Sequence, residues 1–421
     1  MRLLLILTEF PPRIGGMQTH AAYLARHLAE QGHAIEVFTH CCGDPALAAE
    51  AADYDRELPY PVYRTLGRLS FRHNLNQLAS HVRHYPADLI YASTVYYGLL
   101  RQMTGIPVVC RSVGNDVMRP WLGYPYSAGS RLLNSPRLER LLHAWLEKHH
   151  YPDWAEALFR RRREQLTGEA ARAASALLAN SAYTADLLRA LDVPDTRIHT
   201  LVGGVDSARF DLAGTGKNDA RQALRLPESA FLVMTACRLV AKKGIDLLLD
   251  ALPRLRAKLP HLHLVVVGDG KYRSRFERQC ADAGIGNVTF AGRIPHRDIH
   301  AYYAAADLFV LASRESVNPL TGTRDVETMG RVLCEANAAG VPVLASRSGG
   351  IPSVIADGDN GLLFDPENLD QLVEKIRHLH DRPELRVRLA ARGQLRARDE
   401  FDWHHIFASH LAVFETACRA G

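Results

Sequence analysis

Two glutamates with seven residues between them, Glu327 and Glu335, bracket the stretch of this chain best suited to chemistry. A helical pattern follows Gly330 and ends at Gly340 and Pro342, so we expect Glu327 in a loop and Glu335 in the first helical turns. The free N–H groups of a helix start favour an anion, and glycine permits close backbone approach. An ionised carboxylate only accepts hydrogen bonds, so each glutamate could hold a pair of hydroxyls. The stretch therefore predicts a site for a ligand with a diphosphate and hydroxyl-rich ends.

The alternative is that Glu327 is a solvated loop residue and Glu335 an ordinary helix-surface residue, because glutamates at this spacing also arise by chance. The loop after the predicted strand 231–236 adds two cations, Arg238 and Lys243. Two cations beside a helix start would form a diphosphate site. Loops are also polar simply because they face water, so plain surface charge is the other interpretation of this pair.

The elements that must position these residues follow a repeated strand–helix pattern. Residues 2–8 predict a buried parallel strand, residues 19–30 a helix and residues 34–39 a second strand, with Gly15 and Gly16 in the first connection. Open α/β sheets bind ligands at the carboxyl ends of their strands. The two glycines could therefore contact phosphate, or they could merely make the loop flexible, since no G-x-G-x-x-G fingerprint is present.

A polar loop follows the predicted strand 108–111 and contains Asn115 and Asp116. Its place at a strand's carboxyl end suits contact with a substrate hydroxyl. Asn and Asp also favour turns and helix caps, so a purely structural role is the alternative.

The length of 421 residues exceeds what one hydrophobic core usually supports, so we expect two domains. The small, glycine-rich stretch 213–218 marks the boundary. We therefore predict an N-terminal acceptor-binding domain over 1–212 and a C-terminal donor-binding domain over 213–400. The amphipathic segment 401–421 is expected to form a helix that packs back on the first domain.

Composition is that of a soluble globular protein, with 47% hydrophobic and 23% charged residues and a net charge of +5. That charge is compatible with phosphorylated ligands or an anionic membrane surface and is too weak to indicate nucleic acid. Seven scattered cysteines argue against a disulfide framework and favour reducing cytosol. No histidine spacing matches a zinc site, and no apolar run is long enough to span a bilayer.

A basic run, Arg160 to Arg163, follows several aromatic residues. Such a segment could lie on the inner face of a membrane. A solvated basic helix face is the alternative, because charge runs usually face water.

In the order and spacing of its motifs, the sequence resembles the retaining glycosyltransferases of family 4, over nearly its whole length. That family has the GT-B fold, an α/β architecture of two facing Rossmann-like domains with parallel sheets and a C-terminal helix that crosses back. The motifs that carry the resemblance are the glycine loop at 15–16, Asn180-Ser181, Gly204-Val205-Asp206, Arg238 to Gly244, Gly268-Asp269-Gly270, Phe290-Ala291-Gly292, the Glu327/Glu335 pair and Gly349-Gly350-Ile351-Pro352.

The resemblance implies a role for each candidate residue. Arg238 and Lys243 would hold the diphosphate of a sugar donor, and Glu327 would contact the donor sugar close to the reacting carbon. Glu335 would bind the ribose. Gly15 and Gly16 would face the phosphate from the other domain, and the backbone near Arg293 and Ile294 would contact the base. The backbone of Met329, Gly330, Arg331 and Val332 would hold sugar and phosphate. Independently of the resemblance, we assign Asn115 and Asp116 to the acceptor side because their loop follows the carboxyl end of a predicted strand, and we place Gly15 there with them.

The chain also departs from the family pattern. Met329 stands where phenylalanine is common, and Ser353 stands where glutamate is usual. The loop from Arg314 to Val326 is long, and the loop at 112–116 lacks the histidine that many members carry.

These observations predict a retaining hexosyltransferase that uses a nucleotide diphosphate-sugar, with a UDP- or GDP-sugar expected as donor. We expect a front-face mechanism without a metal or cofactor, because no carboxylate-rich metal site is evident and fixed positive charge can stabilise the leaving group. Glycan, lipid-linked and small-molecule acceptors stay open, as does oligomeric state, and we expect a cytoplasmic protein with peripheral membrane contact left open. The alternatives are a nucleotide-sugar hydrolase or epimerase, and a catalytically silent nucleotide-sugar-binding protein. A dehydrogenase is disfavoured by the missing dinucleotide fingerprint.

Overall fold

The computed structural model describes residues 1–12, 15–67, 71–118, 141, 145, 164–212, 214, 216–317 and 324–420. The run Arg160 to Arg163, with the membrane contact considered for it, lies outside these residues. The chain forms two compact units: unit 1 comprises Met1–Leu201 and Phe407–Gly421, and unit 2 comprises Val202–Ile406.

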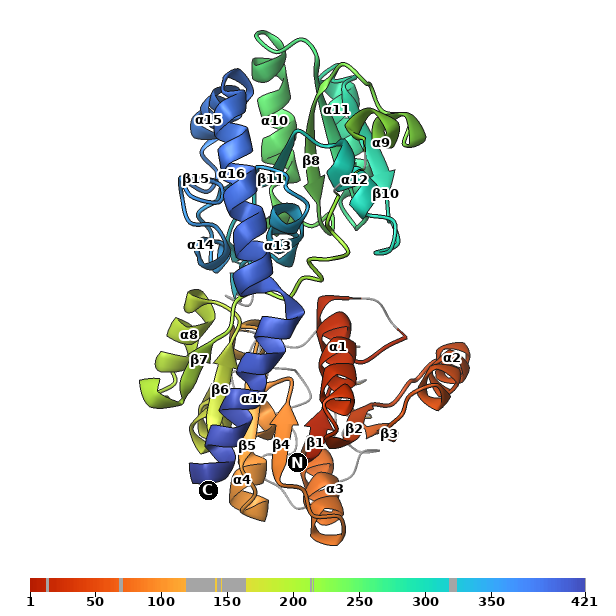
Figure 1. Ribbon diagram of the computed structural model, residues 1–421, viewed down its shortest axis with the longest axis vertical. Coiled ribbons are helices and arrows are strands. Elements are labelled where there is room, and N and C mark those ends of the chain that lie inside the picture. Colours follow the sequence, from red (N-terminus) through yellow and green to blue (C-terminus); the bar gives the residue numbers. More distant parts are fainter. Residues whose placement is uncertain are drawn as a thin grey trace. The chain divides into compact units, whose positions relative to one another are not determined.

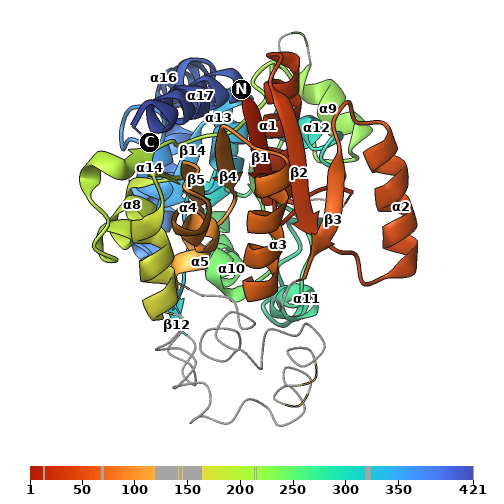
Figure 2. The ribbon, with the colours of Figure 1, turned by 90° about the horizontal axis from the view of Figure 1, so that it is seen from below.

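Unit 1 is built on a parallel sheet whose described strands run in the order β3-β2-β1-β4-β5-β6-β7. These strands are β1 (Arg2–Ile6), β2 (Ala34–His40), β3 (Val62–Leu66), β4 (Leu89–Ala92), β5 (Val108–Ser112), β6 (Ala176–Ala179) and β7 (Ile198–Thr200). The helices described in this unit are α1 (Gly16–Glu30), α2 (Pro45–Arg56), α3 (Phe71–His84), α4 (Leu100–Thr104), α5 (Asn115–Met118) and α8 (Ala182–Arg189). The chain order reverses between β1 and β4, which is the switch point where doubly wound sheets bind ligands. Helix α2 lies beyond the β3 edge of the sheet (Figures 1 and 2).

The last helix, α17 (Trp403–Ala420), begins in unit 2, and its part from Phe407 onward belongs to unit 1. There Phe414 is fully buried, and its ring centroid lies 5.5 Å from that of Tyr91 on β4. Phe407 packs against His20 of α1 at 5.7 Å. The apolar face of the final segment therefore completes the core of unit 1 (Figure 1).

Unit 2 repeats this architecture with the strand order β10-β9-β8-β11-β14-β15. The strands are β8 (Phe231–Ala236), β9 (Leu262–Val267), β10 (Val288–Gly292), β11 (Leu308–Leu311), β14 (Val343–Ser346) and β15 (Leu362–Phe364), with a small antiparallel hairpin of β12 (Ser316–Val317) and β13 (Arg324–Asp325). The helices are α9 (Lys217–Ala223), α10 (Ile245–Arg256), α11 (Arg273–Asp282), α12 (His300–Ala305), α13 (Arg331–Ala338), α14 (Ile351–Val354), α15 (Leu369–Asp381) and α16 (Pro383–Arg396). Its switch point lies between β8 and β11.

Strand β8 shows why unit 2 needs helices on both faces. Successive strand residues point to opposite faces, and here every one of them is apolar or small. Leu232, Met234 and Ala236 enter one core with α12 and α13, while Val233 enters a second core with α10 and α15. The helices around the central strands are visible in Figure 1.

The division between the units falls at Val202, before the glycine-rich stretch at 213–218 where the sequence analysis placed it. The reason is that the N–H groups of Gly204 and Val205 donate to the carbonyl of Phe401, at 2.8 and 3.0 Å. Val205 and Phe210 are buried in the core of unit 2. This linking segment is thus held by the second core. The division of acceptor and donor binding between the units stays a prediction.

No helix among the described residues is both long enough and apolar enough to cross a bilayer. A hollow of about 920 Å³ lies in unit 1 at the amino-terminal edge of the sheet, beside Arg2, Ala34 and Pro61. None of the predicted site residues lines it. It lies at the sheet edge opposite to the one where such folds bind ligands.

Candidate active site

The switch point of unit 2 brings together two of the predicted loops. Strands β8 and β11 are hydrogen-bonded neighbours, so the loops that follow their carboxyl ends emerge side by side. The first loop carries Arg238 and Lys243, and the second leads to Glu327. Residues 84 positions apart in the sequence are thereby brought into contact.

Lys243 and Glu327 form an ion pair in which the ammonium donates to Oε2 of the carboxylate. Their side chains are only 11% and 14% exposed. Burial acts to raise the pKa of Glu327, but the nearby charges of Lys243 and Lys242 outweigh it, so this pKa lies below its ordinary value. Burial also acts to lower the pKa of Lys243, and the charge of Glu327 reverses that effect and raises it. Both groups are therefore charged at neutral pH.

Two glycine positions hold this pair in place. Gly244 ends the Lys243 turn with φ +61°, and a Cβ there would lie 1.9 Å from the carbonyl oxygen of Ala312. Gly349 has φ +52°, and a Cβ there would lie 2.2 Å from the carbonyl oxygen of Glu327, which accepts a 2.8 Å hydrogen bond from Gly350 N–H. Only glycine permits these approaches, so the loops after β8, β11 and β14 are locked together around the carboxylate.

Lys242 also helps to hold the Glu327 loop, a role that was not predicted from the sequence. Its side chain is buried and pairs with Asp325 Oδ1 at 2.8 Å. It also donates to the carbonyl of Val326 at 3.2 Å, one residue before Glu327. The two adjacent lysines differ in nothing that local sequence reveals, so only the structure distinguishes the one that holds the loop from the one that holds the carboxylate.

Arg238 is exposed, unlike the two lysines. Among the described residues its side chain has no hydrogen-bond or ion-pair partner, yet its charge helps to lower the pKa of Glu327. It therefore lies beside the ion pair with its guanidinium available to a ligand.

Helix α13 begins where the sequence predicted. Gly330 precedes it with φ +85°, a left-handed conformation that glycine adopts without strain. Met329 is buried in the core, while Arg331 and Val332 are half-buried in the first turn. The start of this helix thus follows the Glu327 loop directly.

Glu335 is 3% exposed, so it is not an ordinary surface residue. Its Oε2 accepts from the hydroxyl of Tyr303 at 3.1 Å, and its Oε1 lies 3.3 Å from His296 Nε2 and 3.6 Å from Arg331 Nε. Burial acts to raise its pKa, but hydrogen bonding by His296 and the charge of Arg331 hold the pKa below its ordinary value. The carboxylate is therefore ionised at neutral pH and fixed in direction.

His296 and Tyr303 were not identified from the sequence. His296 follows Arg293 and Ile294 in the loop after β10, so it joins the predicted base-contacting loop to Glu335. Arg293 is exposed and Ile294 half-buried. Tyr303 looks like an ordinary core aromatic on α12, and only the strand order brings its hydroxyl to Glu335.

The remaining predicted residues belong to unit 1. Gly15 has an extended backbone, and its carbonyl accepts from the N–H and the hydroxyl of Thr19, both at 2.9 Å. Gly16 is exposed in the first turn of α1 and Asn115 is exposed in that of α5.

The side chain of Asp116 has partners within unit 1. One carboxylate oxygen accepts from the hydroxyl of Ser112 at 2.7 Å, and the other accepts from the N–H of Val95 at 3.0 Å. Its side chain is buried, and burial raises its pKa despite these hydrogen bonds. This geometry gives Asp116 a structural part, and its acceptor role stays a prediction.

Comparison with known proteins gives the family. A profile described as "Glycosyltransferase Family 4" matches residues 14–209, and one described as "Glycosyl transferases group 1" matches residues 216–396. The chain belongs to the family 4, group 1 glycosyltransferases. It is a retaining hexosyltransferase that takes its sugar from a nucleotide-sugar donor. The resemblance, fold and enzyme class inferred from the sequence are thus confirmed, and the roles of single residues stay predictions.

Two relatives and one structure illustrate what this glycosyltransferase is similar to. The GDP-mannose-dependent alpha-(1-6)-phosphatidylinositol monomannoside mannosyltransferase of Mycolicibacterium smegmatis is 27% identical over 95% of each chain. The glycogen synthase of Mycobacterium tuberculosis is 26% identical over 100% of this chain and 95% of its own. The Anabaena protein Alr3699/HepE, solved with UDP, has a TM-score of 0.72 at 20% identity, covering 99% and 100% of the two chains, and shows the shared GT-B fold.

Proposed function

We propose that this glycosyltransferase uses GDP-mannose as its donor and a lipid-linked glycan as its acceptor, by a front-face reaction at the switch point of unit 2. The observation that carries the site assignment is the buried pair of Lys243 and Glu327 directly before the start of α13. The donor and acceptor rest on the similarity to the phosphatidylinositol monomannoside mannosyltransferase along nearly the full chain.

The departing group is a nucleoside diphosphate, whose charge grows as the bond from the sugar carbon to phosphate oxygen breaks. Lys243, the guanidinium of Arg238 and the start of α13 provide positive potential that is already in place. The same bond-breaking step frees a phosphate oxygen to accept the proton of the acceptor hydroxyl. The new bond then joins the acceptor oxygen to the sugar carbon on the face that the diphosphate leaves.

Glu327 suits positioning better than nucleophilic attack. Its pKa is lowered and its Oε2 already accepts from Lys243, both of which make the carboxylate a poorer nucleophile. Its negative charge would instead stabilise positive charge that develops on the sugar. Glu335, ionised and fixed by Tyr303 and His296, would accept from the ribose hydroxyls.

The test is sugar transfer by the purified full chain, with GDP-mannose and UDP-glucose compared at equal concentration. We expect Lys243→Ala and Glu327→Ala each to lower kcat/KM by about a hundredfold, the scale of losing one preorganised charge at a reacting centre. The matched control is Arg254→Ala, which breaks an exposed pair with Asp370 and should leave the rate unchanged. Near-wild-type rates in both site variants would refute the assignment.

The identities of the donor and of the acceptor are tested in separate experiments. A GDP-induced rise in melting temperature larger than that from UDP supports the mannosyl donor, because a ligand of the native state raises apparent stability. Transfer to a phosphatidylinositol mannoside but not to glycogen supports the lipid-linked acceptor. Sugar release that no acceptor accelerates would instead favour the hydrolase alternative.

Metal independence is part of the proposal. Among the described residues no cluster of three or more His, Cys, Asp or Glu is arranged to hold an ion. We expect full activity after exhaustive treatment with a chelator. A loss that Mg²⁺ or Mn²⁺ restores would contradict this part of the mechanism.

A further inference from the structure

A buried pair of amide side chains joins α13 to the turn that follows α14. Asn337, on α13, and Asn360, in the turn after α14, are 1% and 0% exposed. The side-chain nitrogen of Asn360 donates to Asn337 Oδ1 at 2.6 Å, and that of Asn337 donates to the carbonyl of Asn360 at 3.4 Å. Neither residue belongs to the predicted site.

The side chain of Asn360 makes every hydrogen bond that an amide can make. Besides Asn337, its nitrogen donates to the carbonyl of Val354 at 3.0 Å. Its oxygen accepts from the N–H of Ala356 at 2.8 Å and from Arg396 Nη1 at 3.0 Å. Such a saturated amide has one preferred orientation and therefore presents a fixed donor to Asn337.

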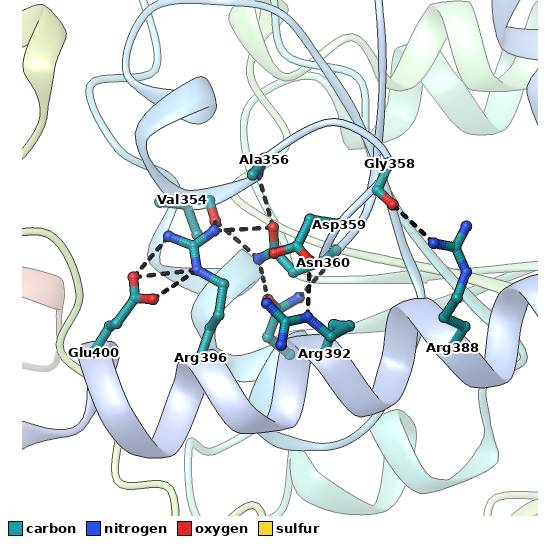
Figure 3. Close-up of polar contacts among 10 residues, drawn as sticks. Val354, Ala356, Gly358, Asp359, Asn360, Arg388, Arg392, Arg396 and Glu400 are labelled. Atoms are coloured by element: carbon teal, nitrogen blue, oxygen red, sulfur yellow. Dashed lines mark hydrogen bonds and ion pairs between the residues drawn. The ribbon is translucent and has the colours of Figure 1, made fainter.

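Arg396 anchors the network to α16. Its guanidinium also donates to the carbonyl of Val354 at 3.1 Å, pairs with Glu400 at 2.7 Å and lies 5.0 Å from the ring centroid of Phe401. Figure 3 shows Arg388, Arg392 and Arg396 reaching from this helix toward the turn that carries Asn360. Phe401 in turn accepts the hydrogen bonds of the linking segment at 204–205.

Helix geometry links this network to the donor site. Asn337 comes two residues after Glu335, so their side chains leave α13 roughly 200° apart around its axis, at 3.6 residues per turn. Glu335 faces His296 and Tyr303, while Asn337 faces the Asn360 turn and Gly393 of α16, where a Cβ would lie 2.9 Å from Asn337 Cγ. A rotation of this short helix would move both side chains at once.

We propose that Asn337 is a positioning residue, which through Asn360 and Arg396 sets the rotation of α13 and so the direction of Glu335 and of the N–H groups after Gly330. A buried polar pair suits this purpose because its hydrogen bonds are directional, whereas apolar contacts would allow the helix to turn. The inference rests on the proposed function, in which α13 contacts the donor.

The test measures binding of GDP and UDP by calorimetry, well below the melting temperature of each variant. Asn337→Ala removes the acceptor of Asn360 and should weaken nucleoside diphosphate binding about tenfold while leaving the KM for the acceptor unchanged. Asn337→Leu keeps most of the side-chain volume and loses both hydrogen bonds, so it should weaken binding about as much as the alanine variant, which a loss of packing alone would not predict. Arg392→Ala is the matched control, because it breaks only a half-exposed 2.8 Å pair with Asp359 between the same helix and turn.

Two results would overturn the proposal: nucleotide affinity within about twofold of wild type in the alanine variant, or affinity within about twofold of wild type in the leucine variant. If Asn337→Ala does not fold, Arg396→Lys decides by the same affinity criterion, since it keeps the charge and loses the planar contact with Asn360. Glu335→Gln distinguishes a failure of the proposed donor site from a failure of the positioning role of Asn337. If it leaves affinity unchanged, the donor site itself is misplaced; if it weakens binding and Asn337→Ala does not, only the positioning role fails.

Discussion

The ammonium of Lys243 donates to the carboxylate of Glu327 in a site where neither side chain is more than 14% exposed. The two residues come from loops that follow neighbouring strands at the switch point of unit 2. A buried pair of this kind is costly to break on one side, because the remaining charge stays in a poorly solvated place. The pair therefore links the stability of the unit to the geometry of the predicted site.

The stability of Glu327→Gln should depend on pH relative to wild type. The pKa of Glu327 is lowered on folding, so its charge contributes its full stabilisation above the ordinary pKa of 4.5. That contribution is lost as the pH falls through the pKa of the folded state. The raised pKa of Lys243 contributes stability below its ordinary value of 10.5, which is lost as pH rises through the folded one. We expect the variant to be less stable by about 3 kcal/mol at neutral pH. Denaturant unfolding at several pH values should show this gap closing as the pH falls below 4.5; a constant gap would contradict it.

Tyr303→Phe should weaken donor binding without abolishing transfer. The change removes the 3.1 Å hydrogen bond to Glu335 and leaves the ring in the core. Since one hydrogen bond to a charged group is worth about 1.5 kcal/mol, we expect KM for the donor to rise about tenfold with kcat nearly unchanged. Tyr302→Phe, next in sequence and half-buried, is the control and should change neither.

Gly330→Ala should cost both stability and activity. Gly330 has φ +85°, and a Cβ there would lie 3.0 Å from Leu333 Cδ1. A non-glycine residue in this region costs about 1–2 kcal/mol, and relief of that strain would shift the start of α13. Gly284→Ala is a close control, because Gly284 has φ +62° with nothing within 4 Å of a Cβ and lies outside the predicted site. Both variants should have a lower melting temperature than wild type, while steady-state kinetics should show impaired transfer for Gly330→Ala alone.

Asp116→Asn tests whether this carboxylate is structural or binds the acceptor. Its two oxygens accept from Ser112 and from the N–H of Val95. With the amide oxygen of the variant toward Val95, the amide nitrogen would face the Ser112 hydroxyl, whose proton would lose its present acceptor. We expect a loss of about 1–3 kcal/mol in unfolding free energy, from the unsatisfied group, and an acceptor KM within about twofold of wild type. A large rise in acceptor KM with unchanged stability would assign Asp116 to the acceptor site after all.

The amino-acid sequence by itself determined the alternation of strands and helices, the glycine at the start of α13 and the place of Glu335 in its early turns. These features follow from local patterns: apolar runs, turn residues and helix punctuation. The motif order also sufficed to indicate the family.

Only the tertiary structure decided which side chains meet. Lys243 and Glu327, or Glu335 and Tyr303, are joined because β8, β11 and their flanking helices become neighbours, and strand order leaves no trace in local periodicity. The distinct tasks of Lys242 and Lys243 depend likewise on a one-residue difference in direction at a turn. Burial then sets the electrostatics, because the same carboxylates in water would have neither fixed partners nor shifted pKa values.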